Sequence, residues 1–132
     1  MFSNRSAWVM SALGGASALL AATVVPAVAH HAAPSVIFSP DKEVVLMGTV
    51  KEFHFSNPHG SIRIAVPSDG KTVEWRVLTE SPNDLEKAGM APTSLRAGDH
   101  VTVRARPAKT GGSSAWLLDV KKADGTTFNV DD

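Results

Sequence analysis

The chain contains no cysteine among its 132 residues. It therefore cannot form disulfide bonds, carry a lipid on a cysteine or hold a metal ion through thiolates. It also lacks an excess of charge of either sign, with 13 Lys and Arg against 13 Asp and Glu. Because proteins that bind nucleic acid usually have a clear excess of basic residues, we expect no nucleic-acid partner.

Motifs of several enzyme classes are missing as well. The sequence has no Gly-x-Ser-x-Gly turn, no glycine-rich phosphate loop and no His-Glu-x-x-His pair. Ser56, His59 and Ser61 lie close together in the sequence, but a nucleophile needs a base within spatial reach that a third group orients. We predict from this that the protein is not an enzyme.

The N-terminal part of the chain has the features of an export signal. An apolar run over residues 9–25 follows a short region whose charged side chain is Arg5, and it leads to Ala27-Val28-Ala29, a small-x-small cleavage signal. A transmembrane helix is the alternative, but Gly14-Gly15 interrupts the run. We therefore predict a signal peptide over residues 1–29 that is cleaved after Ala29, a periplasmic location and no stable membrane insertion after cleavage.

The remainder of the chain has the pattern of short strands. Residues 30–43 lack periodicity and are predicted to form an extended arm, followed by a domain over residues 44–132. Strands are predicted where apolar and polar residues alternate between turn pairs such as Asp69-Gly70. A short helix is predicted between Ser81, which can cap it, and Gly89. The predicted strands span residues 44–56, 61–66, 72–78, 100–106, 114–120 and 126–130.

The order of these elements predicts the fold. Three strands, a short helix and two further strands are the order found in the oligonucleotide/oligosaccharide-binding (OB) barrel. We predict an all-β fold with one short helix, a small OB-fold-like β-β-β-α-β-β barrel after the signal peptide; a six-stranded sandwich or a half-open roll would give similar local patterns. The apolar positions expected in the core are Val50, Ile62, Ile64, Val73, Trp75, Val77, Leu85, Val101, Val103 and Leu118.

An ordered set of short motifs runs through the same part of the chain. These motifs are Gly48-Thr49-Val50, Asn57-Pro58-His59, Asp69-Gly70, Glu74-Trp75, Ser81-Pro82, Leu95-Arg96-Ala97-Gly98-Asp99 and Pro107-Ala108. The set resembles a family of small exported bacterial proteins known as domain of unknown function 6152. The resemblance implies export and supports the barrel fold, but the family name supplies no activity.

Two histidines follow the predicted cleavage site, and they suggest a metal site. His30 would be the first residue of the mature chain, so its amine and its ring Nδ1 could chelate one metal ion. An imidazole of His31 or His59 would complete three nitrogen ligands, which suit Cu(II), or Zn(II) in a tetrahedral site. The alternatives are an arm that only tolerates histidine and a loop His59 that bonds to a backbone carbonyl. His54 and His100 are expected on strands, without a ligand role.

A binding module without catalytic activity is the second hypothesis. Barrels of this type bind ligands on the outer face of strands two and three and with the flanking loops. That face is predicted to offer Arg63, Glu74 and Arg76, with Asn57 in the adjoining turn, and its mixed charges suit a protein or a small polar ligand. We therefore predict an exported, soluble, non-catalytic binding module, with copper or zinc binding as the alternative.

Overall fold

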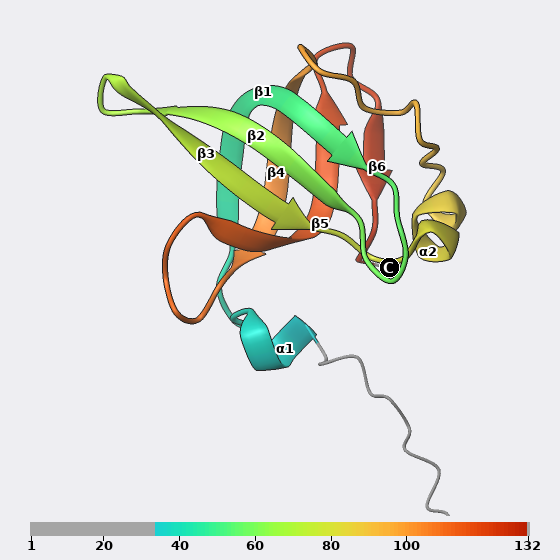
Figure 1. Ribbon diagram of the computed structural model, residues 1–132, viewed down its shortest axis with the longest axis horizontal. Helices are drawn as coiled ribbons and strands as arrows, with labels where there is room; N and C mark the ends of the chain where they lie inside the picture. Colours follow the sequence, from blue (N-terminus) through green and yellow to red (C-terminus); the bar gives the residue numbers. More distant parts are fainter. Residues whose placement is uncertain (1–33, 132) are drawn as a thin grey trace, which may run out of the picture.

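Strand β1 (Val44–His54) is bent, so that its two halves pair with different neighbours. In the computed structural model, which describes residues 34–131, its first half is antiparallel to β4 (His100–Pro107). From Thr49 onward it is antiparallel to β2 (Ser61–Ser68). The bend wraps one strand around two sides of the molecule, which allows the sheet to curl into a barrel (Figure 1).

Glycine is required at the bend for reasons of space. A Cβ atom at Gly48 would overlap the backbone carbonyl oxygen of Ala65 and would lie 2.9 Å from Cγ2 of Ile64. The register of β1 against β2 then shifts at Lys51, which forms a bulge. A bulge increases the local twist of a strand, so the glycine and the bulge together turn β1 from one neighbour to the other.

The remaining strands close the barrel. Strand β3 (Lys71–Leu78) is antiparallel to β2, β5 (Ser114–Lys122) is antiparallel to β4, and β6 (Thr127–Asn129) is antiparallel to β5. The sheet order is β3-β2-β1-β4-β5-β6. A parallel pairing of β3 with β5 closes the first five strands into a barrel, and β6 lies beside β5 outside this ring. The predicted OB-fold-like barrel, with its β-β-β-α-β-β order, is confirmed, and β6 corresponds to the short terminal strand predicted over residues 126–130.

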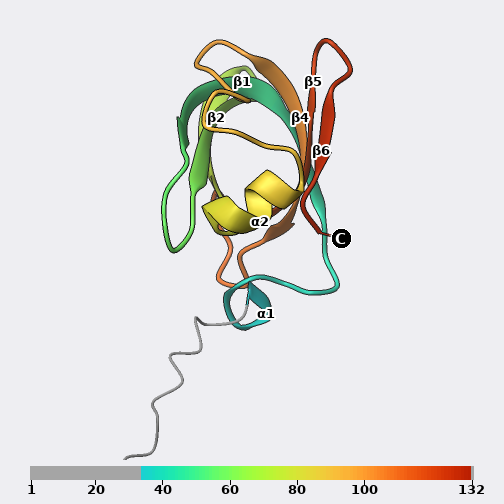
Figure 2. The same cartoon turned by 90° about the vertical axis from the view of Figure 1, so that its right-hand side faces the viewer.

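Helix α2 (Pro82–Lys87) lies across one end of the barrel (Figure 2). Ser81 caps the start of the helix, as predicted. Its Oγ accepts a hydrogen bond from the backbone N–H of Asp84 at 3.4 Å and donates one to the Asp84 carboxylate at 2.7 Å. Leu85 is fully buried beneath the helix. The helix therefore closes the barrel end with one apolar side chain and presents its charged residues to solvent.

Eight of the ten predicted core residues are buried, and the prediction is wrong for Val73 and Trp75, which are half-buried. The reason is the geometry of β3. It pairs with β5 only from Arg76 onward, and its first half extends with β2 as a hairpin beyond the barrel (Figure 1). Leu118 is buried as predicted, but it lies outside the main core cluster.

The predicted extended arm is not extended in its described part. Helix α1 (Pro34–Ile37) forms one short turn, and Phe38 after it is only 3% exposed. Phe38 forms an isolated bridge with Ala108, and the Ile37 carbonyl accepts a hydrogen bond from the backbone N–H of Lys109 at 3.0 Å. Burial of one aromatic side chain thus fixes the end of the arm on the β4–β5 loop.

The predicted signal peptide and residues 30–33 of the arm lie outside the described residues. Within residues 34–131, no helix is both long enough and apolar enough to cross a membrane.

Candidate functional site

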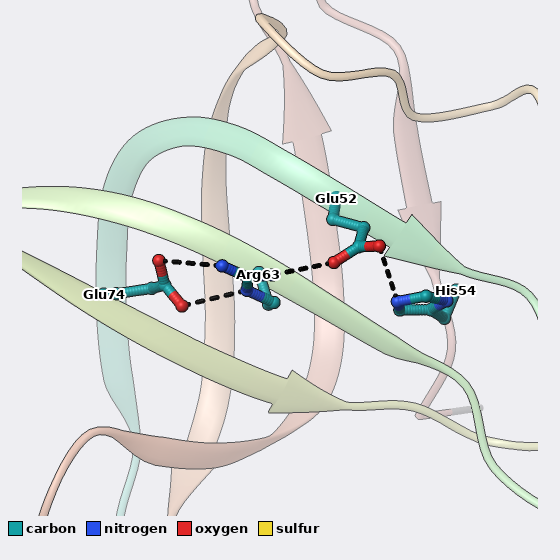
Figure 3. Close-up of polar contacts among 4 residues, drawn as sticks. All are labelled: Glu52, His54, Arg63 and Glu74. Atoms are coloured by element: carbon teal, nitrogen blue, oxygen red, sulfur yellow. Dashed lines mark hydrogen bonds and ion pairs between the residues drawn. The ribbon is translucent and has the colours of Figure 1, made fainter.

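Four titratable side chains form a row across the outer face of β1, β2 and β3 (Figure 3). Arg63 of β2 donates from Nε and Nη2 to the two carboxylate oxygens of Glu74 on β3, at 2.9 and 3.2 Å. Its Nη1 donates to Oε2 of Glu52 on β1 at 2.9 Å. The other oxygen of Glu52 lies 2.8 Å from Nε2 of His54. One arginine therefore links two carboxylates from neighbouring strands.

The strand register explains this arrangement. Arg76 stands directly opposite Arg63, whereas Glu74 is its diagonal neighbour, so Arg63 turns toward the carboxylate rather than the like charge. The hydrogen bond to Glu74 is the main cause that raises the pKa of Arg63, followed by the hydrogen bond to Glu52. The bond from Arg63 in turn lowers the pKa of Glu74. All these groups reach solvent, so the row fixes the positions of charges more than it stabilises the fold.

Arg76 is an exposed cation on this face. Its backbone N–H donates to the carbonyl of Ser113 at 2.9 Å, which ties β3 to the β4–β5 loop. Its side chain is exposed and forms no ion pair or hydrogen bond with another residue of the described chain. Of the predicted ligand-binding residues, the structure thus places Arg63 and Arg76 side by side. Asn57 is exposed in the loop after β1, apart from both arginines.

His59 belongs to an aromatic cluster at the outside of the barrel. Its ring centroid lies 5.2 Å from that of Trp116, and the two rings meet edge to face at 79°. Phe38 from the arm contacts the same indole at 5.8 Å. The side chain of Trp116 is only 5% exposed. The described end of the arm and His59 therefore share one buried indole.

The predicted metal site is only partly covered by the described residues. His30 and His31 lie outside them, and His59 is half-buried in the cluster with Trp116. Between residues 34 and 131, no three or more His, Asp or Glu side chains lie close enough together to hold a metal ion. A site that includes His59 would therefore need ligands from the segment before Pro34, which stays a prediction.

Sequence reasoning missed Glu80, a half-buried carboxylate that interacts electrostatically with His59. Burial is the main cause that raises the pKa of Glu80, the negative charge of Asp84 raises it further, and His59 opposes the shift. Glu80 lines a cavity of about 450 Å³ between α2 and the end of β6. Glu80 is the second residue after the end of β3, in an irregular segment where no periodicity indicates which side chains are buried.

We expect Glu80→Gln to change how stability depends on pH. The folded state holds the Glu80 proton more tightly than the unfolded chain does, because its pKa is raised. This contribution to stability is fully present below the unfolded pKa and is lost as the pH rises through the higher folded pKa. The free energy of unfolding of the variant, relative to that of the wild type, should therefore increase as the pH rises from 4 to 7. Urea unfolding measures this difference.

The control for this prediction is Glu86→Gln, which makes the same substitution at an exposed position of α2. It should follow the wild-type pH dependence. A Glu80→Gln protein that loses stability relative to wild type between pH 4 and pH 7 would contradict the assignment.

Comparison with known proteins places the chain in a family. A family model described as a family of unknown function (DUF6152) matches residues 16–118. The chain belongs to this family. The resemblance inferred from the short motifs is thereby confirmed, and the family is one of small barrels without an assigned activity. No curated protein is similar enough in sequence to count as a match.

Solved structures share the barrel at low sequence identity. One crystal form of the mitochondrial single-stranded DNA-binding protein Rim1 from S. cerevisiae is 20% identical, with a TM-score of 0.49, and the match covers 62% of this chain and 93% of that chain. Another form is 15% identical, also with a TM-score of 0.49, and the match covers 62% of this chain and 92% of that chain. These likenesses concern the fold.

The prediction that the protein has no nucleic-acid partner was wrong. The proteins with solved structures similar to this barrel are named for binding single-stranded DNA. The prediction rested on the net charge of the whole chain, whereas recognition depends on the charges of one local surface. A balanced total of 13 basic and 13 acidic residues therefore excludes no class of partner.

Proposed function

We propose that this member of the family is a non-catalytic binding module of the periplasm, whose ligand contacts the outer face of β2 and β3. The observation that carries the proposal is the row in which Arg63 links Glu52 and Glu74 (Figure 3). Mutual ion pairs hold these three groups in place before a ligand arrives, and fixed polar groups lose less entropy on binding. OB barrels use this face for recognition.

The chemistry of the face defines what the ligand must carry. The exposed guanidinium of Arg76 suits an anionic group such as a carboxylate or a phosphate. The remaining lone pairs of Glu52 and Glu74 accept hydrogen bonds and suit hydroxyl or amine donors. We therefore expect a ligand that carries both an anionic group and hydrogen-bond donors.

Reversing the charge of Arg76 tests the proposal. Immobilised mature protein is incubated with periplasmic extract in the presence of EDTA, and bound protein, nucleic acid and glycan are each quantified. Arg76→Glu should reduce the amount of the bound component by about fivefold, which is the order expected for one exposed charge contact. Arg96→Glu, the same change at an exposed position in the connector before β4, should leave binding unchanged. Equal capture by the wild type and Arg76→Glu would contradict the proposal.

Export is part of the proposed function, and it has its own test. The features of residues 1–29 that support it are the apolar run and the Ala27-Val28-Ala29 signal. Intact-mass analysis of the protein from the periplasmic fraction should give a chain that begins at His30. Recovery of the uncleaved chain in the membrane fraction would contradict this prediction.

A second candidate function is copper binding by the mature N-terminus, and the contacts of Phe38 favour it. Phe38 and His59 contact the same indole, so the arm is attached beside this histidine. His30 lies eight residues before Phe38, and an extended chain spans roughly 3.3–3.6 Å per residue, so its amine can reach His59. The ion would be held by the amine and Nδ1 of His30 with an imidazole of His59 or His31, and Cu(II) favours such nitrogen ligands.

A further inference from the structure

A groove lies on the outside of the barrel where β1 leaves β2 and continues along β4. Its volume is about 520 Å³, within the range of small-molecule sites. The bend at Gly48 creates it, because Pro67 near the end of β2 has no pairing partner on β1. Its lining includes Met47, Thr49, Pro67, His100, Thr102 and Lys121.

One side of the groove is apolar and open to solvent. The side chain of Met47 is 67% exposed, although methionine is usually buried. Val45, the preceding outward residue of β1, is exposed as well. Pro67 adds apolar surface to the lining. The groove thus offers a place where an apolar group could leave water.

The other side of the groove is cationic. Met47 pairs with Thr102, which pairs with Lys121, so a thioether, a hydroxyl and an ammonium group follow one another across β1, β4 and β5. Lys121 forms no ion pair within residues 34–131, and Lys122 reaches Asp99 only at 3.8 Å. The groove lining contains two lysines and no carboxylate.

His100 completes the cationic side as a fixed hydrogen-bonding group. Its Nδ1 lies 3.2 Å from Oγ1 of Thr49, the residue directly opposite it on β1. This contact orients the ring at the edge of the groove. An anion beside Lys121 would therefore have a neighbouring imidazole that can also donate a hydrogen bond.

We propose that this groove binds a small amphipathic anion, a molecule with one apolar chain and one phosphate, carboxylate or sulfonate group. The apolar chain lies against Met47 and Pro67, and the anionic group lies beside Lys121 and His100. The groove pairs an apolar surface with the ammonium group of Lys121, which has no ion pair within residues 34–131. A neutral hydrocarbon would use only the apolar surface, and a simple inorganic anion would use only the charge. The site is separate from the row of Arg63, so it does not depend on the function proposed above.

Dodecyl phosphate below its micelle-forming concentration is the probe that tests the site. Titration of the mature protein, followed by amide NMR shifts, should give saturable one-site binding, with the largest shifts at Gly48, Val101 and Ala123. Lys121→Glu and Met47→Gln should each weaken binding by about tenfold, because one removes the charge contact and the other the apolar contact. Both residues are exposed, so both variants should keep the wild-type thermal midpoint.

Inorganic phosphate tests whether the charge contact alone is sufficient for binding. Lipid vesicles test whether the natural ligand is a membrane lipid or a free amphiphile. Inorganic phosphate alone should not bind at the same concentration. Cosedimentation with phosphatidylglycerol vesicles that Lys121→Glu abolishes would identify a lipid headgroup with its chain as the ligand, and binding of the monomer alone would identify a free amphiphile.

The matched control is Lys109→Glu in the β4–β5 loop, at the other end of these strands. It makes the same charge reversal and should leave binding unchanged. The proposal is overturned if dodecyl phosphate shows no saturable binding, if the two groove variants bind it as tightly as the wild type, or if inorganic phosphate binds equally well.

Discussion

Met90→Ala is expected to lower the free energy of unfolding by about 2–5 kcal/mol, the range found when a large buried side chain is cut back to alanine. The side chain of Met90 is only 1% exposed and belongs to the main core cluster. It follows α2, so it fills the end of the barrel that this helix covers together with Leu85. Urea unfolding followed by tryptophan fluorescence measures the change.

The same substitution at Met47 is the control. Because this side chain is largely exposed on the outer face of β1, Met47→Ala should change the free energy of unfolding by less than about 0.5 kcal/mol. Similar losses in the two variants would show that the interior and exterior positions of the barrel have been assigned incorrectly.

One additional residue before His30 is expected to weaken Cu(II) binding by about 100-fold or more. The extension keeps every side chain but moves the free amine away from the His30 ring, so the chelate is lost. Loss of an outer hydrogen-bond partner alone typically costs roughly 10–100-fold in metal affinity, and loss of a ligand costs more. Quenching of tryptophan fluorescence can report binding, because His59 lies against Trp116.

Two histidine variants separate a specific site from general chelation. His59→Ala should also weaken Cu(II) binding, whereas His100→Ala should not, because His100 lies on the exposed start of β4 beside Thr49. The copper hypothesis fails if tight binding survives both the N-terminal extension and His59→Ala. The binding-module proposal would then stand alone, since its test is made in the presence of EDTA.

The fold could be predicted largely from the sequence because the local signals agree with one another. Alternation in the strands, the cap at Ser81 and the Asp69-Gly70 turn each act over a few residues, and the structure has all three. Burial of Trp75 was mispredicted for a different reason. Alternation shows which side chains share a face, but it does not show how far a hairpin extends beyond its partners.

The candidate site was less accessible to sequence reasoning. The outward positions of Arg63 and Arg76 follow from alternation, but the strand register decides that Arg63 bonds to Glu74 and Glu52 and that Arg76 stays available. The burial of Glu80 depends on distant segments that pack around it. No spacing in the sequence brings Phe38 to the indole of Trp116, which is a contact between the arm and β5.

Photo-crosslinking in living cells tests the central claim, that the outer face of β2 and β3 binds a ligand. The photoreactive residue p-benzoylphenylalanine is placed at position 76 of the full-length exported chain, and at position 96 as the control. Irradiation should give a discrete adduct from position 76 and none from position 96, and mass spectrometry of that adduct would identify the class of ligand. Adducts of equal yield at both positions, or none at position 76, would contradict the account.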